Sequence, residues 1–237
     1  MEKSLPLLLL LYLSLVLLPS PSPASEDPSF LEARRRMVER DLKGRDITDP
    51  KVLEVMGRIP RQLFVEPSLQ NQAYADHPLP IGEGQTISQP YVVAFMTEIL
   101  RLGSRDRVLE VGTGSGYQAA VAAKIAGEVY TVEIFPSLAD RARKILADLG
   151  FRNVTVRQGD GYYGWEEKGP FDAIIVTCAG GHIPPPLIRQ LRNGGRMVMP
   201  VGGPFLTQNL VFLEKSRDGS LTQRNVLPVV FVRLLGH

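Results

Sequence analysis

Hydrophobic positions change their spacing at about residue 107 of the chain. Before that residue, apolar side chains recur at roughly helical intervals in 30–42, and 49–56 and 89–101 predict two further helices. Beyond it, short and nearly continuous apolar runs alternate with helical segments. Strands are predicted at 107–111, 129–133, 154–156, 171–177, 196–201, 210–214 and 227–234, and helices at 115–126, 136–149 and 185–192. This alternation predicts a parallel sheet that is buried on both faces.

The last two predicted strands are close together in the sequence. Asp218-Gly219 lies between them and favours a hairpin, so one of the two is expected to run antiparallel. Residues 59–88 are rich in Pro, Gly and Gln and predict irregular structure. We therefore expect one α/β domain with a Rossmann-like open sheet at 105–237, mostly parallel, with helices on both faces. A helical region at 29–101 precedes the sheet.

The first 24 residues differ in composition from the rest. Residues 5–18 are almost entirely apolar, Lys3 precedes them, and small side chains at 22–24 offer a cleavage position. This pattern is typical of a secretory signal peptide. The apolar run of about 14 residues is shorter than the roughly 20 that span a bilayer. We expect a cleaved signal and a mature domain at 25–237 that is exported to the periplasm or the outside. An uncleaved anchor and a misassigned start codon are the alternatives.

Composition and charge argue against several classes of protein. Of the 237 residues, 44% are hydrophobic and 22% charged, which is typical of a globular domain. The 27 Lys and Arg nearly balance the 25 Asp and Glu, and the net charge of +2 gives no support for a nucleic-acid partner. The sequence has one cysteine, Cys178, and three histidines. We therefore expect neither an internal disulfide nor a metal site.

A glycine-rich loop follows the first predicted strand of the sheet. Residues 108–117 are VLEVGTGSGY, and such a loop lets the backbone pass close to a ligand at a helix start, where N–H groups are free. The dinucleotide fingerprint needs glycine at the position of Tyr117, and a P-loop needs Gly-Lys-Ser or Gly-Lys-Thr, so neither is present. Glu133 ends the second strand of the sheet and Asp160-Gly161 follows the third. These groups are expected at one edge of the sheet, where open α/β sheets bind ligands.

The loop and its acidic neighbours resemble the class I S-adenosylmethionine-dependent methyltransferases. The resemblance rests on glycines at 112, 114 and 116, on Glu110 before them, and on the acids that end the next two strands. It implies that S-adenosylmethionine is bound as the methyl donor and that Glu133 contacts its ribose hydroxyls. The residues assigned to the cofactor are Glu110, Gly112, Thr113, Gly114, Glu133, Asp160 and Gly161.

A more specific resemblance covers nearly all of the chain beyond the N-terminal segment. Residues 84–94 are GQTISQPYVVA, which is similar to the signature of the protein-L-isoaspartate O-methyltransferases. The match continues in order through 108–120, 129–133, 159–165, 170–177 and 194–202. It implies methylation of the free carboxylate of L-isoaspartyl residues in damaged peptides and proteins. The ester then closes to a succinimide, which reopens partly to normal aspartate, so the reaction starts a repair.

The acceptor chemistry fits the residues of this signature. A carboxylate with a pKa of about 4 is already the nucleophile at neutral pH, so methyl transfer needs alignment and a dry pocket but no general base. The hydroxyls of Thr86 and Ser88 can donate hydrogen bonds to the carboxylate. The resemblance implies that Ser88 is the active-site residue, which we interpret as positioning; capping of a helix that begins at Pro90 is the alternative. The resemblance also implies that 227–232 helps to hold an extended peptide, with core packing as the alternative.

Other interpretations stay open at this point. The same fold and cofactor could serve another carboxylate, a small molecule or a nucleic acid, although an amino-methylating enzyme would resemble a group with an Asn/Asp-Pro-Pro-aromatic loop, where this chain has TCAG at 177–180. A non-catalytic exported binder is a further alternative. The expected partners are isoaspartyl-containing peptides and proteins, with no nucleic acid and a monomeric chain. A membrane is expected to be contacted only through an uncleaved N-terminal segment, and a cytoplasmic location, as is usual for the family, is the alternative to export.

Overall fold

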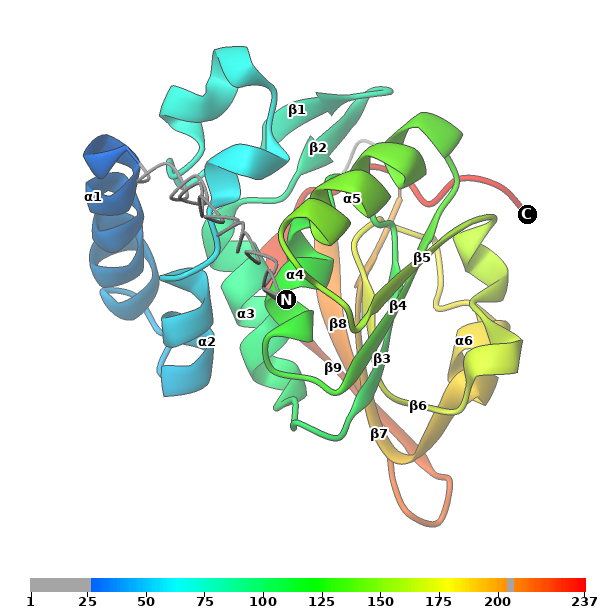
Figure 1. Cartoon of the computed structure of the whole chain (residues 1–237). Coiled ribbons are helices and arrows are strands. Elements are labelled where there is room, and N and C mark those ends of the chain that lie inside the picture. The colour runs from blue at the N-terminus through cyan, green and yellow to red at the C-terminus, as the bar shows by residue number, and fades with distance from the viewer. Residues whose placement is uncertain (1–26, 204–206) are drawn as a thin grey trace, which may run out of the picture.

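The computed structural model describes residues 27–203 and 207–237, so the predicted signal segment at 1–24 lies outside the described residues. In this part of the chain, seven strands form one sheet in the order β5-β4-β3-β6-β7-β8-β9 (Figure 1). A separate two-stranded hairpin consists of β1 and β2. The strands of the large sheet are β3 (Arg107–Val111), β4 (Glu128–Glu133), β5 (Val154–Gln158), β6 (Phe171–Val176), β7 (Leu191–Val201), β8 (Gln208–Lys215) and β9 (Leu221–Val229).

Strand directions agree with the sequence pattern. β3 pairs in parallel with β4 and β6, and the parallel pairing continues to β5 on one side and to β7 on the other. β8 runs antiparallel to both of its neighbours, β7 and β9. β8 is therefore reversed in an otherwise parallel sheet, which confirms the predicted single antiparallel strand near the C-terminus.

Helices cover both faces of the sheet, as predicted (Figure 1). Successive residues of β3 face opposite cores, because side chains alternate along a strand. Val108 packs in the core that contains α4, and Leu109 packs in the core that contains Leu187 of α6. The helices that pack in the first of these cores are α3 (Pro90–Leu100), α4 (Tyr117–Ala123) and α5 (Pro136–Asp148). The helices on the side of the second core are short: η4 (Gly161–Tyr163), η5 (Glu166–Lys168) and α6 (Pro185–Gln190).

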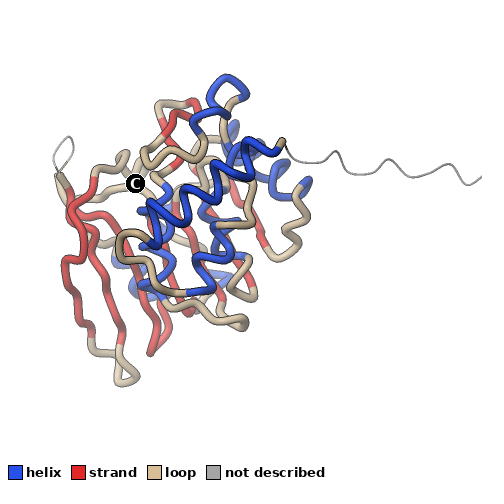
Figure 2. The backbone as a smooth tube through the Cα atoms, turned by 90° about the vertical axis from the view of Figure 1, so that its left-hand side faces the viewer, coloured by secondary structure: helices blue, strands red, loops and turns tan. Residues whose placement is uncertain are grey.

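The N-terminal helices lie outside α3, as the turned view shows (Figure 2). They are α1 (Pro28–Arg36), its π-helical continuation η1 (Met37–Lys43) and α2 (Pro50–Met56). The predicted start of α2 is confirmed, because Asp49 accepts a hydrogen bond from the amide of Lys51 over 2.8 Å and Pro50 takes the first helical position.

Residues 59–88 are more regular than predicted. They contain the 3₁₀ helices η2 (Arg61–Phe64) and η3 (Pro67–Gln72) and the hairpin strands β1 (Leu79–Gly82) and β2 (Gln85–Ile87). The residues between the two strands turn with φ of 52° at Glu83 and 66° at Gly84. Leu79 and Ile87 face each other and are buried, so a few apolar residues fix a hairpin in an otherwise polar stretch.

Several element ends also differ from the predictions. Helix α4 begins at Tyr117 rather than at 115, because Gly114 and Gly116 adopt left-handed φ of 51° and 86°. Strand β9 ends at Val229 instead of continuing to 234. Beyond it the chain pairs with Ala179, whose amide donates to the carbonyl oxygen of Val232 and whose own carbonyl accepts from the amide of Leu234. The terminal segment, residues 230–237, therefore crosses the carboxyl edge of the sheet (Figure 1).

Candidate active site

The carboxyl ends of β3 and β6 meet where the strand order reverses. The chain adds β4 and β5 on one side of β3 and then returns to β6 on the other, which leaves a crevice for ligands at this edge. Gly112 follows β3 and Thr177 follows β6. The Thr177 hydroxyl donates to the carbonyl oxygen of Gly112 over 2.6 Å. A Cβ at Gly112, whose φ is 96°, would collide with this hydroxyl, so the closure of the two strand ends requires glycine.

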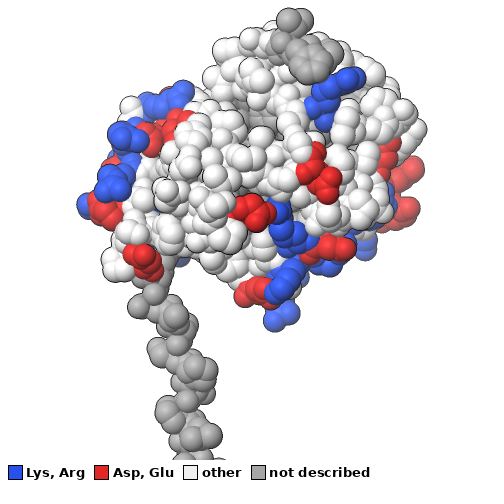
Figure 3. All heavy atoms as spheres, turned by 90° about the horizontal axis from the view of Figure 1, so that it is seen from above, with Lys and Arg blue, Asp and Glu red and all other residues white. Residues whose placement is uncertain are grey.

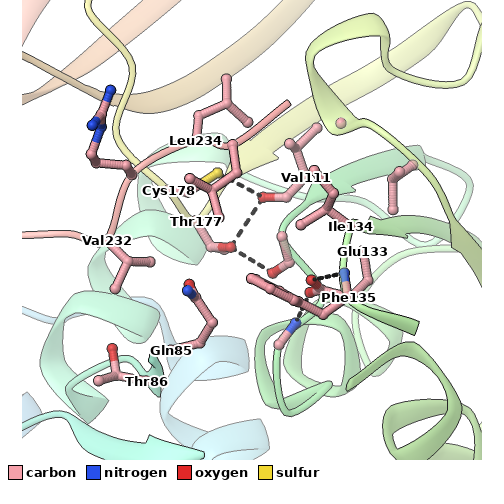
Figure 4. A pocket seen from close by; sticks show the side chains of 16 residues that line it. Gln85, Thr86, Val111, Glu133, Ile134, Phe135, Thr177, Cys178, Val232 and Leu234 are labelled. Atoms are coloured by element: carbon pink, nitrogen blue, oxygen red, sulfur yellow. Dashed lines mark hydrogen bonds between the residues drawn. The ribbon is translucent and has the colours of Figure 1, made fainter. Parts of the chain in front are cut away.

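Glu133, at the end of β4, is bonded to the glycine loop. Its Oε2 accepts from the amide of Gly114 over 2.7 Å, and its Oε1 accepts from the amide of Phe135 over 3.0 Å (Figure 4). The Glu133 side chain is almost fully buried. The carboxylate therefore holds the loop and the residues that follow β4 in a fixed relation.

Other amides of the loop are also satisfied inside the protein. Those of Gly112 and Thr113 donate to the carbonyl oxygen of Val132, and that of Gly116 donates to the carbonyl oxygen of Thr113. The expectation of free N–H groups at this helix start is therefore wrong for these residues, because the tight turns of the loop use them. The loop contributes a close backbone approach instead.

A cavity lies over the glycine loop and the end of β4 (Figure 4). Of the residues predicted to bind the cofactor, Gly112, Gly114, Glu133 and Gly161 line it. At Gly161 a Cβ would collide with the side chain of Val111, so glycine again allows the backbone to form the wall. The other lining residues are Gln85, Thr86, Val111, Val132, Ile134, Phe135, Thr177, Cys178, Val232, Arg233, Leu234 and Leu235. We call this space the loop cavity.

Glu110 lies beneath the glycine loop and does not line the loop cavity. Its side chain is fully buried and accepts a hydrogen bond from the hydroxyl of Thr131, which also contacts Oγ1 of Thr113 at 2.6 Å. Oε1 of Glu110 has no partner among the described residues. Burial raises the pKa of Glu110 to about 8. Direct contact of Glu110 with a cofactor stays a prediction, and the structure connects it to the loop through two threonines.

Asp160 is the N-cap residue of η4 and is bonded to the terminal segment. Its carboxylate accepts from the amide of Tyr162 over 2.9 Å and from the amide of His237 over 2.6 Å. The ring of His237 stacks on that of Tyr162 with 4.4 Å between the ring centres. Asp160 does not line the loop cavity although Gly161 does, and its cofactor contact likewise stays a prediction.

A second cavity, of about 560 Å³, adjoins the loop cavity. The two cavities share Thr86, Thr177 and Val232 as lining residues. Ser88 lines the second cavity, so both predicted acceptor-binding hydroxyls lie on its wall. We call this space the acceptor-side cavity. Its other lining residues are Arg45, Pro78, Gln89, Tyr91, Val92, Thr207, Leu227, Pro228, Val229, Val230 and Phe231.

Ser88 is positioned through its main chain by a buried arginine. Arg61 donates from Nη2 to the carbonyl oxygen of Ser88 over 2.8 Å and from Nε to that of Ala73 over 2.6 Å. Its guanidinium carbon also lies 4.7 Å from the ring centre of Tyr117, the first residue of α4. Complete burial lowers the pKa of Arg61 to about 10. One side chain thus connects the loop of Ser88 with the helix that follows the glycine loop.

The capping alternative for Ser88 is wrong. Helix α3 begins at Pro90 as predicted, but its N-cap residue is Gln89, which makes no side-chain capping bond. Asp76 accepts instead from the amide of Tyr91 over 3.2 Å and from the side chain of Gln89 over 2.7 Å. Because a residue from a preceding loop satisfies the helix start, Ser88 is left to line the acceptor-side cavity.

The surface around this edge of the sheet is mixed in charge. Side chains of both signs surround a wide uncharged area when the molecule is seen from above (Figure 3). Across residues 27–203 and 207–237, no three or more His, Cys, Asp and Glu come together in a group that could hold a metal ion. In the same ranges no helix is both long and apolar enough to cross a membrane.

The family model of the protein-L-isoaspartate(D-aspartate) O-methyltransferases matches residues 32–237, a range that contains the loop cavity and the acceptor-side cavity. The chain belongs to this family.

Individual isoaspartate methyltransferases match over most of their length. The chain is 57% identical over 193 residues to protein-L-isoaspartate O-methyltransferase 2 of Polaromonas, which covers 81% of this chain and 92% of that protein. It is 52% identical over 222 residues to the protein of the same name from Syntrophobacter fumaroxidans, with 90% of each covered.

Two solved structures with this family name also share the fold. One matches with a TM-score of 0.77 and 30% identity, covering 86% of this chain and 66% of that one. The other is from Plasmodium falciparum, in complex with S-adenosyl-L-homocysteine; its TM-score is 0.74 with 26% identity, covering 85% and 98% of the two chains. The predicted family, fold and use of S-adenosylmethionine are confirmed.

The loop cavity has about 50 Å³ of free space, and the chemistry of its lining suits part of the methyl donor of isoaspartate methyltransferases. Glycine at 112 and 161 keeps its walls clear at two points where a side chain would collide with its neighbours. Glu133 lies on the wall as an ionisable acceptor group, which suits the ribose hydroxyls assigned to it. These residues would hold S-adenosylmethionine, which supplies an electrophilic methyl group when it is bound.

Some residues of this isoaspartate methyltransferase site were not predicted from the sequence. Thr177 was taken only as a strand end, yet it lines both cavities and bonds the glycine loop. Residues 232–234 were assigned to a strand and instead form a wall of the loop cavity together with Leu235. For Thr177, the available sequence signal was its position as a polar residue directly after a buried strand at the switch point. The sequence of the terminal segment itself contains no feature that indicates a role at the site.

Proposed function

We propose that this protein transfers the methyl group of S-adenosylmethionine to the free carboxylate of L-isoaspartyl residues in damaged peptides and proteins. The observation that supports this most is the wall common to the loop cavity and the acceptor-side cavity, formed by Thr86, Thr177 and Val232. On this proposal the loop cavity takes the donor and the acceptor-side cavity takes the peptide. The acceptor carboxylate then lies at Ser88, next to the common wall.

The chemistry at that wall is a single displacement. An oxygen of the acceptor carboxylate forms a bond to the methyl carbon as the bond from that carbon to sulfur breaks, and the electron pair of the broken bond stays on sulfur. The products are a methyl ester and S-adenosylhomocysteine. No proton has to move, so the hydroxyls of Thr86 and Ser88 act by donating hydrogen bonds that align the carboxylate.

The cysteine at the site is poorly suited to compete as an acceptor. Cys178 lines the loop cavity, and a thiolate there would be a strong nucleophile toward an electrophilic methyl group. Burial raises the pKa of its thiol far above neutral, with Glu133 and Glu110 adding to the effect. The thiol is therefore protonated at neutral pH and leaves the methyl group to the substrate carboxylate.

The lining of the acceptor-side cavity suits an extended peptide. Residues 227–232 form an apolar side of it, and Val230 is 79% exposed just beyond the end of β9. We propose that this segment packs along the peptide on either side of the isoaspartyl residue.

A matched pair of peptides tests the function. Purified protein is given labelled S-adenosylmethionine and either an isoaspartyl peptide or the same sequence with normal aspartate. We expect base-labile methyl ester only with the isoaspartyl peptide, and much less of it with Ser88→Ala. Normal cofactor binding by calorimetry with no transfer to the isoaspartyl peptide would contradict the proposal and favour another acceptor. No cofactor binding at all would favour the non-catalytic alternative.

We further propose that the chain is exported as a monomer after removal of residues 1–24. The composition of that segment supports export. N-terminal sequencing of the mature protein together with cell fractionation tests it: a start near residue 25 in an exported fraction is expected, and an intact Met1 in the cytoplasm would contradict it. Sedimentation equilibrium at the mass of one chain is the expected result for the oligomeric state.

A further inference from the structure

A small cavity lies between the loop of Ser88 and the glycine loop. It offers about 30 Å³ for a ligand group, enough for one group the size of water or ammonium. Its walls come from 86–88, from 112–115, and from Val93, Tyr117, Gln118 and Thr177. None of these lining residues carries a formal charge.

Gln118 lines this cavity and carries a buried hydrogen-bond acceptor that is unsatisfied. The residue is 7% exposed, and its Nε2 donates to Oγ1 of Thr97 over 3.0 Å. The Thr97 hydroxyl uses its own proton to donate to the carbonyl oxygen of Val93 over 2.8 Å, so it can only accept from Gln118. This fixes the orientation of the amide. Oε1 of Gln118 is then the buried atom with no partner among the described residues.

A buried acceptor without a partner is costly, so a donor is expected to fill the site. The surroundings favour a cationic donor. Gly114, on the same cavity wall, is bonded to the carboxylate of Glu133, and the amides of Gly112, Thr113 and Gly116 are used inside the protein, which leaves fewer amides to attract an anion. The guanidinium of Arg61 lies behind Ser88 and Tyr117 and does not line the cavity.

We infer that Gln118 binds the α-ammonium group at the amino-acid end of the methyl donor. This rests on the proposed function, because it places S-adenosylmethionine in the loop cavity. Four residues line both the loop cavity and the small cavity: Thr86, Gly112, Gly114 and Thr177. A ligand over the glycine loop can therefore extend its amino-acid end to Gln118. Gln118 then distinguishes an intact donor or its thioether product from nucleosides that lack the amino acid.

Three ligands test the contact with the ammonium group separately from the contacts made by the rest of the donor. They are S-adenosylhomocysteine, its analogue with the α-ammonium replaced by hydrogen, and 5′-methylthioadenosine, which lacks the amino-acid end. Their dissociation constants are measured by calorimetry on the full-length protein without peptide. Gln118→Met should raise the constant for S-adenosylhomocysteine about tenfold or more, the loss of one hydrogen bond to a charged group. The other two constants should change less than about twofold, since those ligands never made this bond.

A second variant and a matched control complete the test. Gln118→Glu keeps an acceptor, so it should bind S-adenosylhomocysteine better than Gln118→Met does. Gln190 is equally buried, but both of its amide atoms are bonded, to the amide of Trp165 and the carbonyl oxygen of Tyr163. Gln190→Met should therefore destabilise the fold while leaving the ratios among the three ligands unchanged.

Three results would overturn the inference. Gln118→Met could weaken the binding of all three ligands equally, or it could weaken none of them, which would place water at Oε1. Weaker binding of S-adenosylhomocysteine by Gln118→Glu than by Gln118→Met would place the donor's carboxylate there. Binding is measured without an acceptor peptide. A failure to methylate isoaspartyl peptides would therefore contradict the proposed function and leave this result intact.

Discussion

The backbone amide of Gly114 donates a hydrogen bond to Oε2 of Glu133 over 2.7 Å, which joins the glycine loop to the end of the neighbouring strand. The other carboxylate oxygen accepts from the amide of Phe135. One buried carboxylate therefore orders two segments that line the loop cavity, in addition to the contact with ribose assigned to it.

Removing this carboxylate should affect both stability and cofactor binding. Glu133→Ala leaves two amides without their acceptor and is expected to cost about 1–3 kcal/mol of unfolding free energy. The dissociation constant for S-adenosylhomocysteine should rise at least about tenfold, because charged hydrogen bonds to the ribose are lost. Urea unfolding and calorimetry measure the two effects. Glu128→Ala is the control, since Glu128 is an exposed residue at the other end of the same strand, paired with Arg107, and should cost less than about 1 kcal/mol. Similar cofactor affinities in both variants would refute the assignment of Glu133.

Asp160 and Ser88 should separate cofactor binding from acceptor binding. Asp160→Ala removes the acceptor for the amides of Tyr162 and His237 beside the loop cavity, so we expect weaker cofactor binding. Ser88→Ala changes the wall of the acceptor-side cavity and should mainly lower kcat or raise the KM of the peptide. Calorimetry with S-adenosylhomocysteine and steady-state kinetics distinguish the two. Equal cofactor dissociation constants for both variants would contradict this division.

Glu110 should make the stability of the fold depend on pH. Its pKa of about 8 in the folded protein is well above the value of about 4.3 in an unfolded chain, so over the interval between them the folded state holds a proton that the unfolded state releases. The contribution of Glu110 to stability is therefore complete below about pH 4 and is lost as the pH rises through about 8. Within that interval, the unfolding free energy falls by up to about 1.4 kcal/mol for each unit that the pH rises.

The Glu110→Gln variant removes this titration and serves as its own control. Unfolding free energies measured from pH 5 to pH 8 should decline more steeply for the natural protein than for the variant. Parallel curves would show that Glu110 is ionised in the folded state, and would contradict the assigned effect of burial.

Arg61 should act on the peptide through Ser88. In Arg61→Met the carbonyl oxygens of Ser88 and Ala73 lose their donor, and a shift of the Ser88 loop should raise the KM of the peptide by about tenfold, the equivalent of one lost hydrogen bond. The dissociation constant for S-adenosylhomocysteine should change much less. Arg34 is also buried, and it donates to the carbonyl oxygen of Arg58 away from the site, so Arg34→Met is the matched control for lost stability. If the two variants raise the KM equally, Arg61 has no special role in positioning Ser88.

The sheet and one half of the site followed from the sequence for a physical reason. Buried parallel strands are continuous apolar runs, and their carboxyl ends meet at one edge. The sequence pattern therefore predicts Gly112, Glu133 and Gly161 close together, and in the structure all three line one cavity. The glycines were recognisable because only glycine allows the positive φ and the close approach at these turns.

The other half depends on contacts that no local pattern encodes. Arg61 reaches Ser88 across 27 positions of sequence, and the terminal segment leaves β9 to pair with Ala179 because of tertiary contacts. Ser88 looked like a helix cap from its neighbours, while Asp76 supplies the capping group from 15 residues before Tyr91. Irregular structure was expected for 59–88 because two or three buried side chains, which are too few to form a period, define the hairpin.

The terminal segment has one consequence for how the two ligands influence each other. Val232 belongs to the walls of both the loop cavity and the acceptor-side cavity, and backbone hydrogen bonds to Ala179 hold it there. A peptide that displaces Val232 therefore also reshapes the space for the nucleoside. Thermodynamic linkage then requires the nucleoside to change the peptide's affinity by the same factor. Through this one residue, binding of S-adenosylhomocysteine would change the affinity of the protein for damaged peptides without any change elsewhere in the sheet.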